Sequence, residues 1–241
     1  MKNLTIGIVA EGPTDIEIIQ TLVSKIIPGM HDFLTLQPDI SETEGFGSNG
    51  AGWQGVLNWC KSVPRDFGSL QSFLKNGGPT IDLLIIHIDA DVSREPEIDC
   101  FAPCPLIQNT IDNLRVKIAE WLDESVWPRE ILCCIPADNM EAWIMCAFDV
   151  NTPYHNPPSI LLECLQKPEY IISGQGYNRP ERLLRRKSNG KPHKTVPVYV
   201  NKLIPKLEEK WEDVKKVCSQ AQIFEDNLRT VISRPLSNPL L

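Results

Sequence analysis

Residues 4–26 read LTIGIVAEGPTDIEIIQTLVSKI, and this stretch decides the fold class. Its first part, residues 4–10, is apolar and rich in β-branched side chains, which predicts a buried strand. Residues 11–13, Glu-Gly-Pro, then predict a tight turn. A strand that ends in such a turn is the first half of a strand–turn–helix unit.

The second half of the stretch predicts a helix. Apolar residues recur at helical spacing from Ile18 to Ile26, and Pro28-Gly29 stops the pattern. Thr14, with Glu17 three residues later, makes a capping box, so we expect the helix to begin at Thr14.

Further strands and helices alternate along the chain. Residues 81–88 and 131–135 are nearly continuous apolar runs, as in parallel strands that are buried on both faces. Helical patterns cover 107–122 and 140–148, and a loop over 37–52 precedes another helix. This alternation predicts an α/β fold with a parallel sheet flanked by helices. We place a boundary near residue 150, between domain 1–150 and a smaller, mostly helical extension, 151–241, whose charged helix spans 202–218.

Composition excludes several classes of protein. The chain has 241 residues, 42% hydrophobic and 23% charged, which excludes a disordered tail, a collagen and a coiled coil. Its longest apolar runs are far shorter than the roughly 18 residues of a membrane span. The N-terminus lacks the pattern of a signal peptide, so we expect a cytoplasmic protein. Most of the eight Cys are expected in the core, and Cys100 and Cys104 lack the second pair that a structural zinc site requires.

Charge is divided unevenly between the two halves. The formal net charge is −7, but residues 1–150 hold 9 basic and 22 acidic side chains, whereas 151–241 hold 15 and 9. A basic half favours a phosphate-bearing partner, although a solvated surface has the same composition. The candidate nucleic-acid contacts in the densest basic stretch are Arg182, Arg185, Arg186, Lys187, Lys191 and Lys194.

Acidic residues follow each predicted strand. Glu11 comes after the first, Asp89 and Asp91 after the central one and Glu141 after the next, while Asp15 lies one helical turn beyond Glu11. Because carboxyl ends of parallel strands share one edge of a sheet, these side chains are expected to converge there. Clustered carboxylates favour a bound cation, and oxygen ligands suit Mg²⁺ or Mn²⁺.

The spacing of Asp89-Ala90-Asp91 adds to this hypothesis. Side chains of a strand alternate between faces, so two Asp separated by one residue are predicted to point the same way. The alternative is structural, because Asp is common in turns and at helix starts.

The acidic turn after the first predicted strand and the Asp-x-Asp after the central one, in this order along the chain, resemble the TOPRIM domain. This domain is a metal-binding fold of topoisomerases, primases and nucleases of the OLD (overcoming lysogenisation defect) family. The resemblance covers roughly the first 150 residues, within the usual size of one domain. It is carried by residues 9–15, Val-Ala-Glu-Gly-Pro-Thr-Asp, and 86–91, Ile-His-Ile-Asp-Ala-Asp. With residues 141–143, Glu-Ala-Trp, the chain is most similar to small bacterial TOPRIM-like proteins related to OLD nucleases and RloB, many of them linked to phage defence.

The resemblance implies a Rossmann-like sheet, a site for Mg²⁺ or Mn²⁺ and roles for particular residues. Glu11 would be a metal ligand or acid/base, and Asp89 and Asp91 would hold the metal. Asp15 is carried over as a further ligand and Glu141 as an additional one. The implied activity is phosphodiester hydrolysis, an endonuclease acting on DNA or RNA in antiviral defence.

A cation from the basic segment would complete such a site. The candidates to stabilise the pentavalent phosphate are residues 191–194, Lys-Pro-His-Lys, and Tyr199, with Lys194 as the predicted catalytic cation. The alternative is a surface loop, because Ser188-Asn189-Gly190 predicts a turn nearby. His87 lies inside a predicted strand and is expected in the core.

Two other functions stay open at this point. The chain has no P-loop, so a non-catalytic TOPRIM-like subunit would dock to a separate ATPase partner. A nucleotidyl transferase or small-nucleotide hydrolase would use the same metals. No membrane partner is expected, and homo-oligomerisation is left open.

Overall fold

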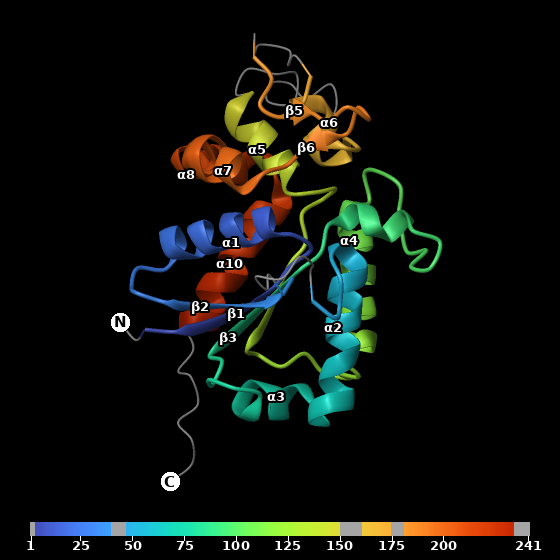
Figure 1. Cartoon of the computed structure of the whole chain (residues 1–241), viewed down its shortest axis with the longest axis vertical. Coiled ribbons are helices and arrows are strands. Elements are labelled where there is room, and N and C mark those ends of the chain that lie inside the picture. Colours follow the sequence, from blue (N-terminus) through green and yellow to red (C-terminus); the bar gives the residue numbers. More distant parts are fainter. Residues whose placement is uncertain (1–2, 40–46, 150–160, 175–180, 234–241) are drawn as a thin grey trace.

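The computed structural model of the chain describes residues 3–39, 47–149, 161–174 and 181–233. A four-stranded parallel sheet lies at its centre in the order β2-β1-β3-β4. Its strands are β1 (Thr5–Val9), β2 (Asp32–Gln37), β3 (Leu83–His87) and β4 (Ile131–Cys134). Helices cover both faces, so the predicted α/β class with a parallel sheet flanked by helices is confirmed (Figure 1).

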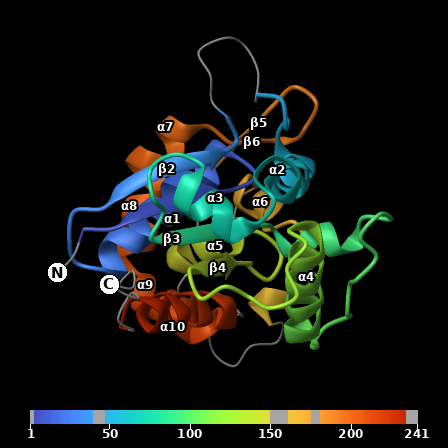
Figure 2. The same ribbon diagram turned by 90° about the horizontal axis from the view of Figure 1, so that it is seen from below.

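Two sets of helices sandwich the sheet (Figure 2). The hydrophobic cluster on one face includes residues of α1 (Pro13–Ile26), α5 (Glu141–Phe148) and α10 (Ser219–Ser233), and also of α8 (Ile204–Glu209) and α9 (Trp211–Val217), which pack on these helices. The other face packs against α2 (Gly52–Phe67), α3 (Leu70–Asn76) and α4 (Ile107–Trp121). Shorter elements are η1 (Ala90–Arg94), η2 (Leu162–Cys164), α6 (Pro168–Ile172), β5 (Arg185–Arg186), β6 (Pro192–His193), α7 (Val196–Val198) and η3 (Tyr199–Leu203).

The alternation of side chains along β3 decides to which face of the sheet each residue points. Leu83 and Ile85 belong to the cluster beneath α1, and Leu84 and Ile86 belong to the cluster beneath α2. Side chains two residues apart share a face of a strand. The next position on the α1 side is therefore that of His87, which is fully buried.

Helix α1 is capped two residues earlier than the sequence predicts, at Gly12 rather than at Thr14. Its first residue is Pro13, and Gly12, with extended backbone, occupies the cap without a side-chain hydrogen bond. Proline suits the first helical position because its missing N–H would have no partner there. This start places Asp15 in the first helical turn, where the helix dipole favours a negative charge.

Three other elements differ from the sequence prediction. Strand β2 was not predicted, because its side chains are mostly half-buried and its apolar pattern is short. The helix predicted over 202–218 is interrupted at Lys210, whose backbone leaves helical geometry between α8 and α9. The predicted loop 37–52 begins inside β2 and lies partly outside the described residues.

The C-terminal helices contribute to the same core as the sheet. Trp143 of α5 packs edge-on against Trp211 of α9, with ring centroids 5.6 Å apart, and also meets Phe224 of α10. All three belong to the hydrophobic cluster that contains Ile6 and Ile85 of the strands. The boundary predicted near residue 150 falls at the edge of 150–160, outside the described residues.

Cysteines occupy two kinds of position. Cys60, Cys134, Cys146 and Cys218 are buried in the core, as predicted. Cys104 forms a disulfide with Cys164 of η2, which joins the segment before α4 to the C-terminal half and was not predicted. Over the described ranges, none of the helices has the length and apolar character that crossing a membrane demands.

Candidate functional site

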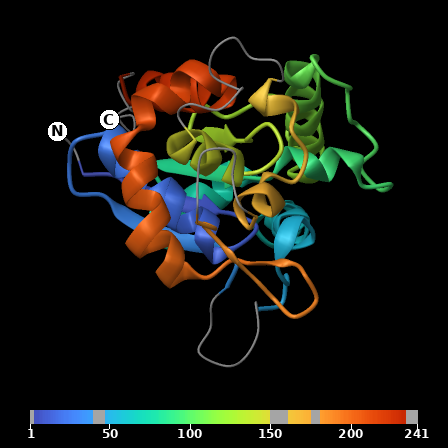
Figure 3. The same ribbon diagram turned by 90° about the horizontal axis from the view of Figure 1, so that it is seen from above.

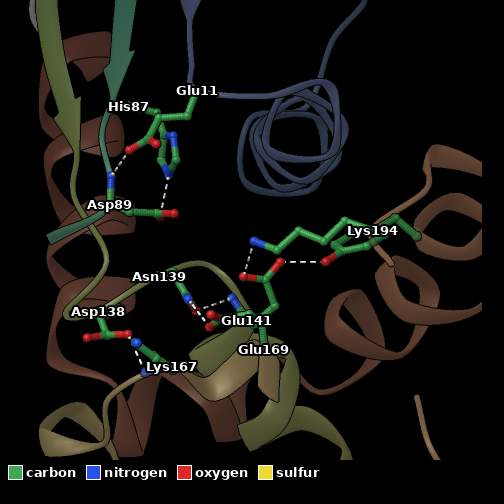
Figure 4. A network of polar contacts seen from close by, with 10 residues as sticks. Glu11, His87, Asp89, Asp138, Asn139, Glu141, Lys167, Glu169 and Lys194 are labelled. Carbon is green, nitrogen blue, oxygen red and sulfur yellow. Dashed lines mark hydrogen bonds and ion pairs between the residues drawn. The ribbon is translucent and has the colours of Figure 1, made fainter. Parts of the chain in front are cut away.

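The candidate site lies where β1, β3 and β4 end. Glu11 follows β1, Asp89 follows β3, and Asp138 and Asn139 follow β4. Because the strands are parallel, their carboxyl ends bring these turns to one edge of the sheet, beside the start of α1 (Figure 4).

Glu11 and Asp89 are directly joined across this edge. Glu11 Oε1 accepts a hydrogen bond of 2.8 Å from the backbone N–H of Asp89. The two residues are 78 positions apart in sequence. The predicted convergence of the first and central strands is therefore present.

His87 lies between these carboxylates, and the sequence analysis gave it no role beyond the core. Its Nε2 is 3.2 Å from Asp89 Oδ1. Burial would by itself lower the pKa of His87, but Asp89, Asp15 and Glu11 raise it to about 9. A cationic imidazole thus partly neutralises the acidic cluster. The signal that could have revealed it is its position two residues before Asp89, whose backbone is still extended.

Burial and mutual repulsion perturb the carboxylates. Loss of water and then the charge of Asp89 raise the pKa of Glu11 well above its ordinary value. Burial is also the main cause that raises the pKa of Asp15 to about 6, with Asp89 and Glu141 adding to it and His87 and Lys194 opposing it. These shifts show that the acidic groups face one another in a region with little water.

Asp89 and Asp91 are not two alternate residues of one strand, as the sequence analysis assumed. The strand ends at His87, and Asp91 lies in the 3₁₀ helix η1, so the argument from alternating faces is wrong here. Burial, followed by the charges of Asp89 and Asp138, raises the pKa of Asp91 to about 7. Asp91 therefore extends the acidic cluster on the side of Asp138.

Glu141 is held by two partners from the C-terminal half. Its side chain is fully buried, Oε2 is 2.7 Å from Lys194 Nζ, and Tyr199 donates its hydroxyl hydrogen bond to Oε1. Each oxygen thus has one partner already, and the metal role predicted for Glu141 stays a prediction. Tyr199 was named with the basic segment as a candidate for the phosphate, but its contact with Glu141, 58 residues away, was not predicted.

Lys194 reaches the cluster, as predicted. Figure 4 shows its ammonium directed toward Glu141 and toward the side on which Asp89 and His87 lie. Burial would lower the pKa of Lys194, but Glu141, Asp15 and Asp89 raise it above its ordinary value. About a third of this side chain is exposed (34%), so a ligand can touch it from solvent.

A second layer of polar contacts fixes the turn after β4. Asp138 binds Arg94 at 2.6 Å and the backbone N–H of Lys167 at 2.8 Å. Asn139 donates to Glu169 of α6 and accepts from the backbone N–H of Glu141. These residues were not predicted, and only their position after a strand distinguishes them in the sequence.

The predicted nucleic-acid residues other than Lys194 lie on and around the β5–β6 hairpin. They are exposed and outside the carboxylate cluster: Arg182, Arg185, Arg186, Lys187 and Lys191. Figure 3 shows this hairpin, in orange, near the rim of the molecule.

The donor set fits a hard divalent cation in its chemistry. Glu11, Asp15, Asp89 and Asp91 supply carboxylate oxygens, the ligands that Mg²⁺ and Mn²⁺ prefer. A cation would also relieve the repulsion that raises the pKa of Glu11, Asp15 and Asp91. As the side chains lie, however, no three His, Cys, Asp or Glu residues of the described ranges are grouped closely enough to hold one.

Comparison with family models, with curated proteins and with solved structures gave no significant match. The resemblance to TOPRIM proteins therefore depends on the residues at the ends of β1 and β3.

Proposed function

We propose that this protein is a TOPRIM-type, divalent-metal-dependent phosphodiester hydrolase, an endonuclease acting on nucleic acid. The observation that carries the proposal is the contact between Glu11 and Asp89, which joins two TOPRIM-like motifs at the carboxyl edge of the sheet. Its neighbours Asp15 and His87 are buried, as is Asp89, and Glu11 is half-buried. The resemblance to phage-defence proteins supports a role in antiviral defence.

The residues of the site divide into three roles. Glu11, Asp15, Asp89 and Asp91 would hold Mg²⁺ or Mn²⁺, which when bound polarises a phosphate oxygen and lowers the pKa of water. His87 offsets their charge from the α1 side of the sheet. Lys194, partly exposed beside them, donates hydrogen bonds to the phosphate oxygens that gain charge as the bond to the leaving oxygen breaks.

Glu141 and Tyr199 position Lys194 in this scheme. The ammonium is tied to a carboxylate that is itself held by a buried hydroxyl. A cation fixed in this way needs little reorganisation when charge develops on the phosphate, and such preorganisation is a large part of electrostatic catalysis.

The test is cleavage of end-labelled DNA and RNA, single- and double-stranded, with Mn²⁺, Mg²⁺ or EDTA. We expect cleavage only with metal, and at least about 100-fold slower cleavage by Glu11→Gln, Asp89→Asn and Lys194→Gln, because each loses a contact that forms in the transition state. Asp112→Asn, an exposed carboxylate on α4, is the matched control and should cleave like wild type.

Calorimetric titration with Mn²⁺ checks the metal separately from catalysis. Glu11→Gln and Asp89→Asn should weaken binding, and Asp112→Asn should not. If wild type cleaves in EDTA, or if both site variants cleave at the wild-type rate, the assignment of these carboxylates fails.

One observation favours a second candidate, a non-catalytic subunit that docks to an ATPase partner. Within the described ranges no three acidic, His or Cys side chains lie close enough together to hold a metal ion, and Glu141 already forms an ion pair with Lys194. This candidate predicts no Mn²⁺ binding by the purified protein, no cleavage of any nucleic acid, and recovery of an ATPase in pull-down from the native host.

A further inference from the structure

A groove beside the β5–β6 hairpin stands apart from the carboxylate site. It has a volume of about 550 Å³ and lies between the hairpin, the segment before it and the start of the C-terminal helices. Hollows of this size enclose small organic ligands. Its cationic lining is Arg182, Arg185, Arg186, His193 and Lys202.

Most of the cationic side chains that line the groove form no close ion pair with another described residue. Arg182 and Arg185 are exposed and have no hydrogen-bond or ion-pair partner among the described residues. Lys202 lies 3.8 Å from exposed Glu181, a long ion pair. Arg186 is held in place by Ser173 Oγ at 3.1 Å. Unpaired guanidinium groups around a hollow fit phosphate groups, which they bind in a bidentate manner.

The floor of the groove is apolar, unlike its rim. Leu183 and Leu184 are buried beneath it, and Val198 is half-buried at its side. His193 adds an exposed aromatic ring. A duplex offers phosphates but keeps its bases paired inside, whereas a single strand exposes bases that stack on rings and apolar surface. Cations above an apolar floor therefore favour a single strand.

The groove and the carboxylate site share one extended segment as a wall. His193 and Thr195 line the groove, and Lys194 between them binds Glu141. Thr195 has extended backbone, in which neighbouring side chains point to opposite sides. A ligand in the groove would thus be separated from the Lys194 side chain by the backbone of this one segment.

We infer that this groove binds the sugar-phosphate backbone of single-stranded nucleic acid, with phosphates on Arg182, Arg185 and Lys202 and a base against His193 and Val198. The inference deepens the proposed function, on which it depends for the class of ligand. It assigns the substrate strand to a place outside the carboxylate cluster.

The test is fluorescence anisotropy of labelled 12-nucleotide oligo-dT and oligo-U, and of a mixed-sequence duplex of the same length, in EDTA over a series of salt concentrations. We expect single strands to bind at least about tenfold more tightly than the duplex. The double variant Arg182→Gln/Arg185→Gln should bind at least about tenfold more weakly, and its salt slope should fall by about 1.4, since each phosphate contact on a single strand contributes about 0.7. Circular dichroism checks that it is folded.

Lys75→Gln is the matched control, because Lys75 is an exposed cation on α3 at the opposite end of the molecule from the hairpin (Figure 1). It should bind like wild type. The inference is overturned if the duplex binds as tightly as the single strands, if the folded double variant binds like wild type, or if tripolyphosphate competes as well as oligo-dT at equal phosphate concentration. Binding is measured in EDTA and does not require cleavage. The test can therefore support or overturn the groove even if the proposed nuclease activity is absent.

Discussion

At the scale of single residues, the carboxylates of the acidic cluster are expected to lower the stability of the folded protein. Asp15 is 5% exposed and shares its surroundings with Glu11 and Asp89. Burial and repulsion favour the protonated form of such a carboxylate, and a bound cation would reverse that preference. Site residues of this kind are expected to lower the stability of the metal-free protein.

Asp15→Asn should stabilise the metal-free protein at neutral and higher pH. The pKa of Asp15 is about 6 in the folded protein, against about 3.9 in an unfolded chain. The folded state binds this proton more tightly, so stability falls as pH rises between these values and stays lower above them. We expect a gain of roughly 2–3 kcal/mol at about pH 8 and little difference near pH 3.5.

Urea unfolding in EDTA at both pH values measures this difference. Asp112→Asn, on the exposed face of α4, should change stability at neither pH. A gain that is equal at both pH values would show that charge at Asp15 is not its cause.

Tyr199→Phe should destabilise the protein and loosen Lys194. The variant removes the hydroxyl that donates to fully buried Glu141 and leaves that oxygen unsatisfied. A buried acceptor without its donor costs about 1–3 kcal/mol. Chemical denaturation measures the cost, and Tyr170→Phe, at a half-exposed tyrosine of α6, is the control. Equal stability of the two variants would mean that the Tyr199 hydroxyl contributes nothing to holding Glu141.

At the scale of elements, one carboxylate joins the last two helices. Glu225 of α10 accepts hydrogen bonds from Trp211 and Lys215 of α9 and from Arg229 of its own helix, at 2.7–2.8 Å. Burial raises the pKa of Glu225, but Lys215, Arg229 and Trp211 together lower it below its ordinary value. This group fixes α9 against α10, which cover one face of the sheet.

Glu225→Gln should therefore destabilise the protein in a pH-dependent way. Because the pKa of Glu225 is lowered by folding, its contribution is present above the unfolded pKa of about 4.3 and is lost as pH falls through the folded value. We expect a loss of about 3 kcal/mol at neutral pH, as for a broken buried ion pair, and a smaller loss below about pH 3. Thermal unfolding at several pH values measures it, with exposed Asp226→Asn as the control. A loss that does not shrink in acid would contradict the electrostatic account.

At the scale of the whole molecule, the sheet depends on helices from both ends of the chain. Phe224 and Trp211 share a cluster with Ile6, Leu83 and Trp143. A core of this kind couples the two halves energetically, so they are expected to unfold together.

Phe224→Ala should lower the stability of the entire protein by about 3–5 kcal/mol, the usual cost of removing a buried phenyl ring. Differential scanning calorimetry should show one transition for wild type and variant, with equal calorimetric and van't Hoff enthalpies. Val200→Ala, at an exposed site, is the control. Two separate transitions, only one of them shifted, would instead support independent units divided near residue 150.

Much of the fold follows from local pattern. The apolar runs predicted β1, β3 and β4, and helical spacing predicted α1, α2, α4 and α5, because each periodicity reports a buried face. Strand β2 and the break at Lys210 could not be predicted, since a half-buried edge strand and a turn between charged helices leave little apolar signal.

The sequence by itself determined that Glu11 and Asp89 each follow a buried strand, because the ends of apolar runs are encoded locally. Only the tertiary structure decided that these two strands are neighbours and that Lys194 and Tyr199 hold Glu141. The physical reason is distance along the chain: hydrogen bonds between residues more than 50 positions apart depend on how helices pack, and no local periodicity records that packing.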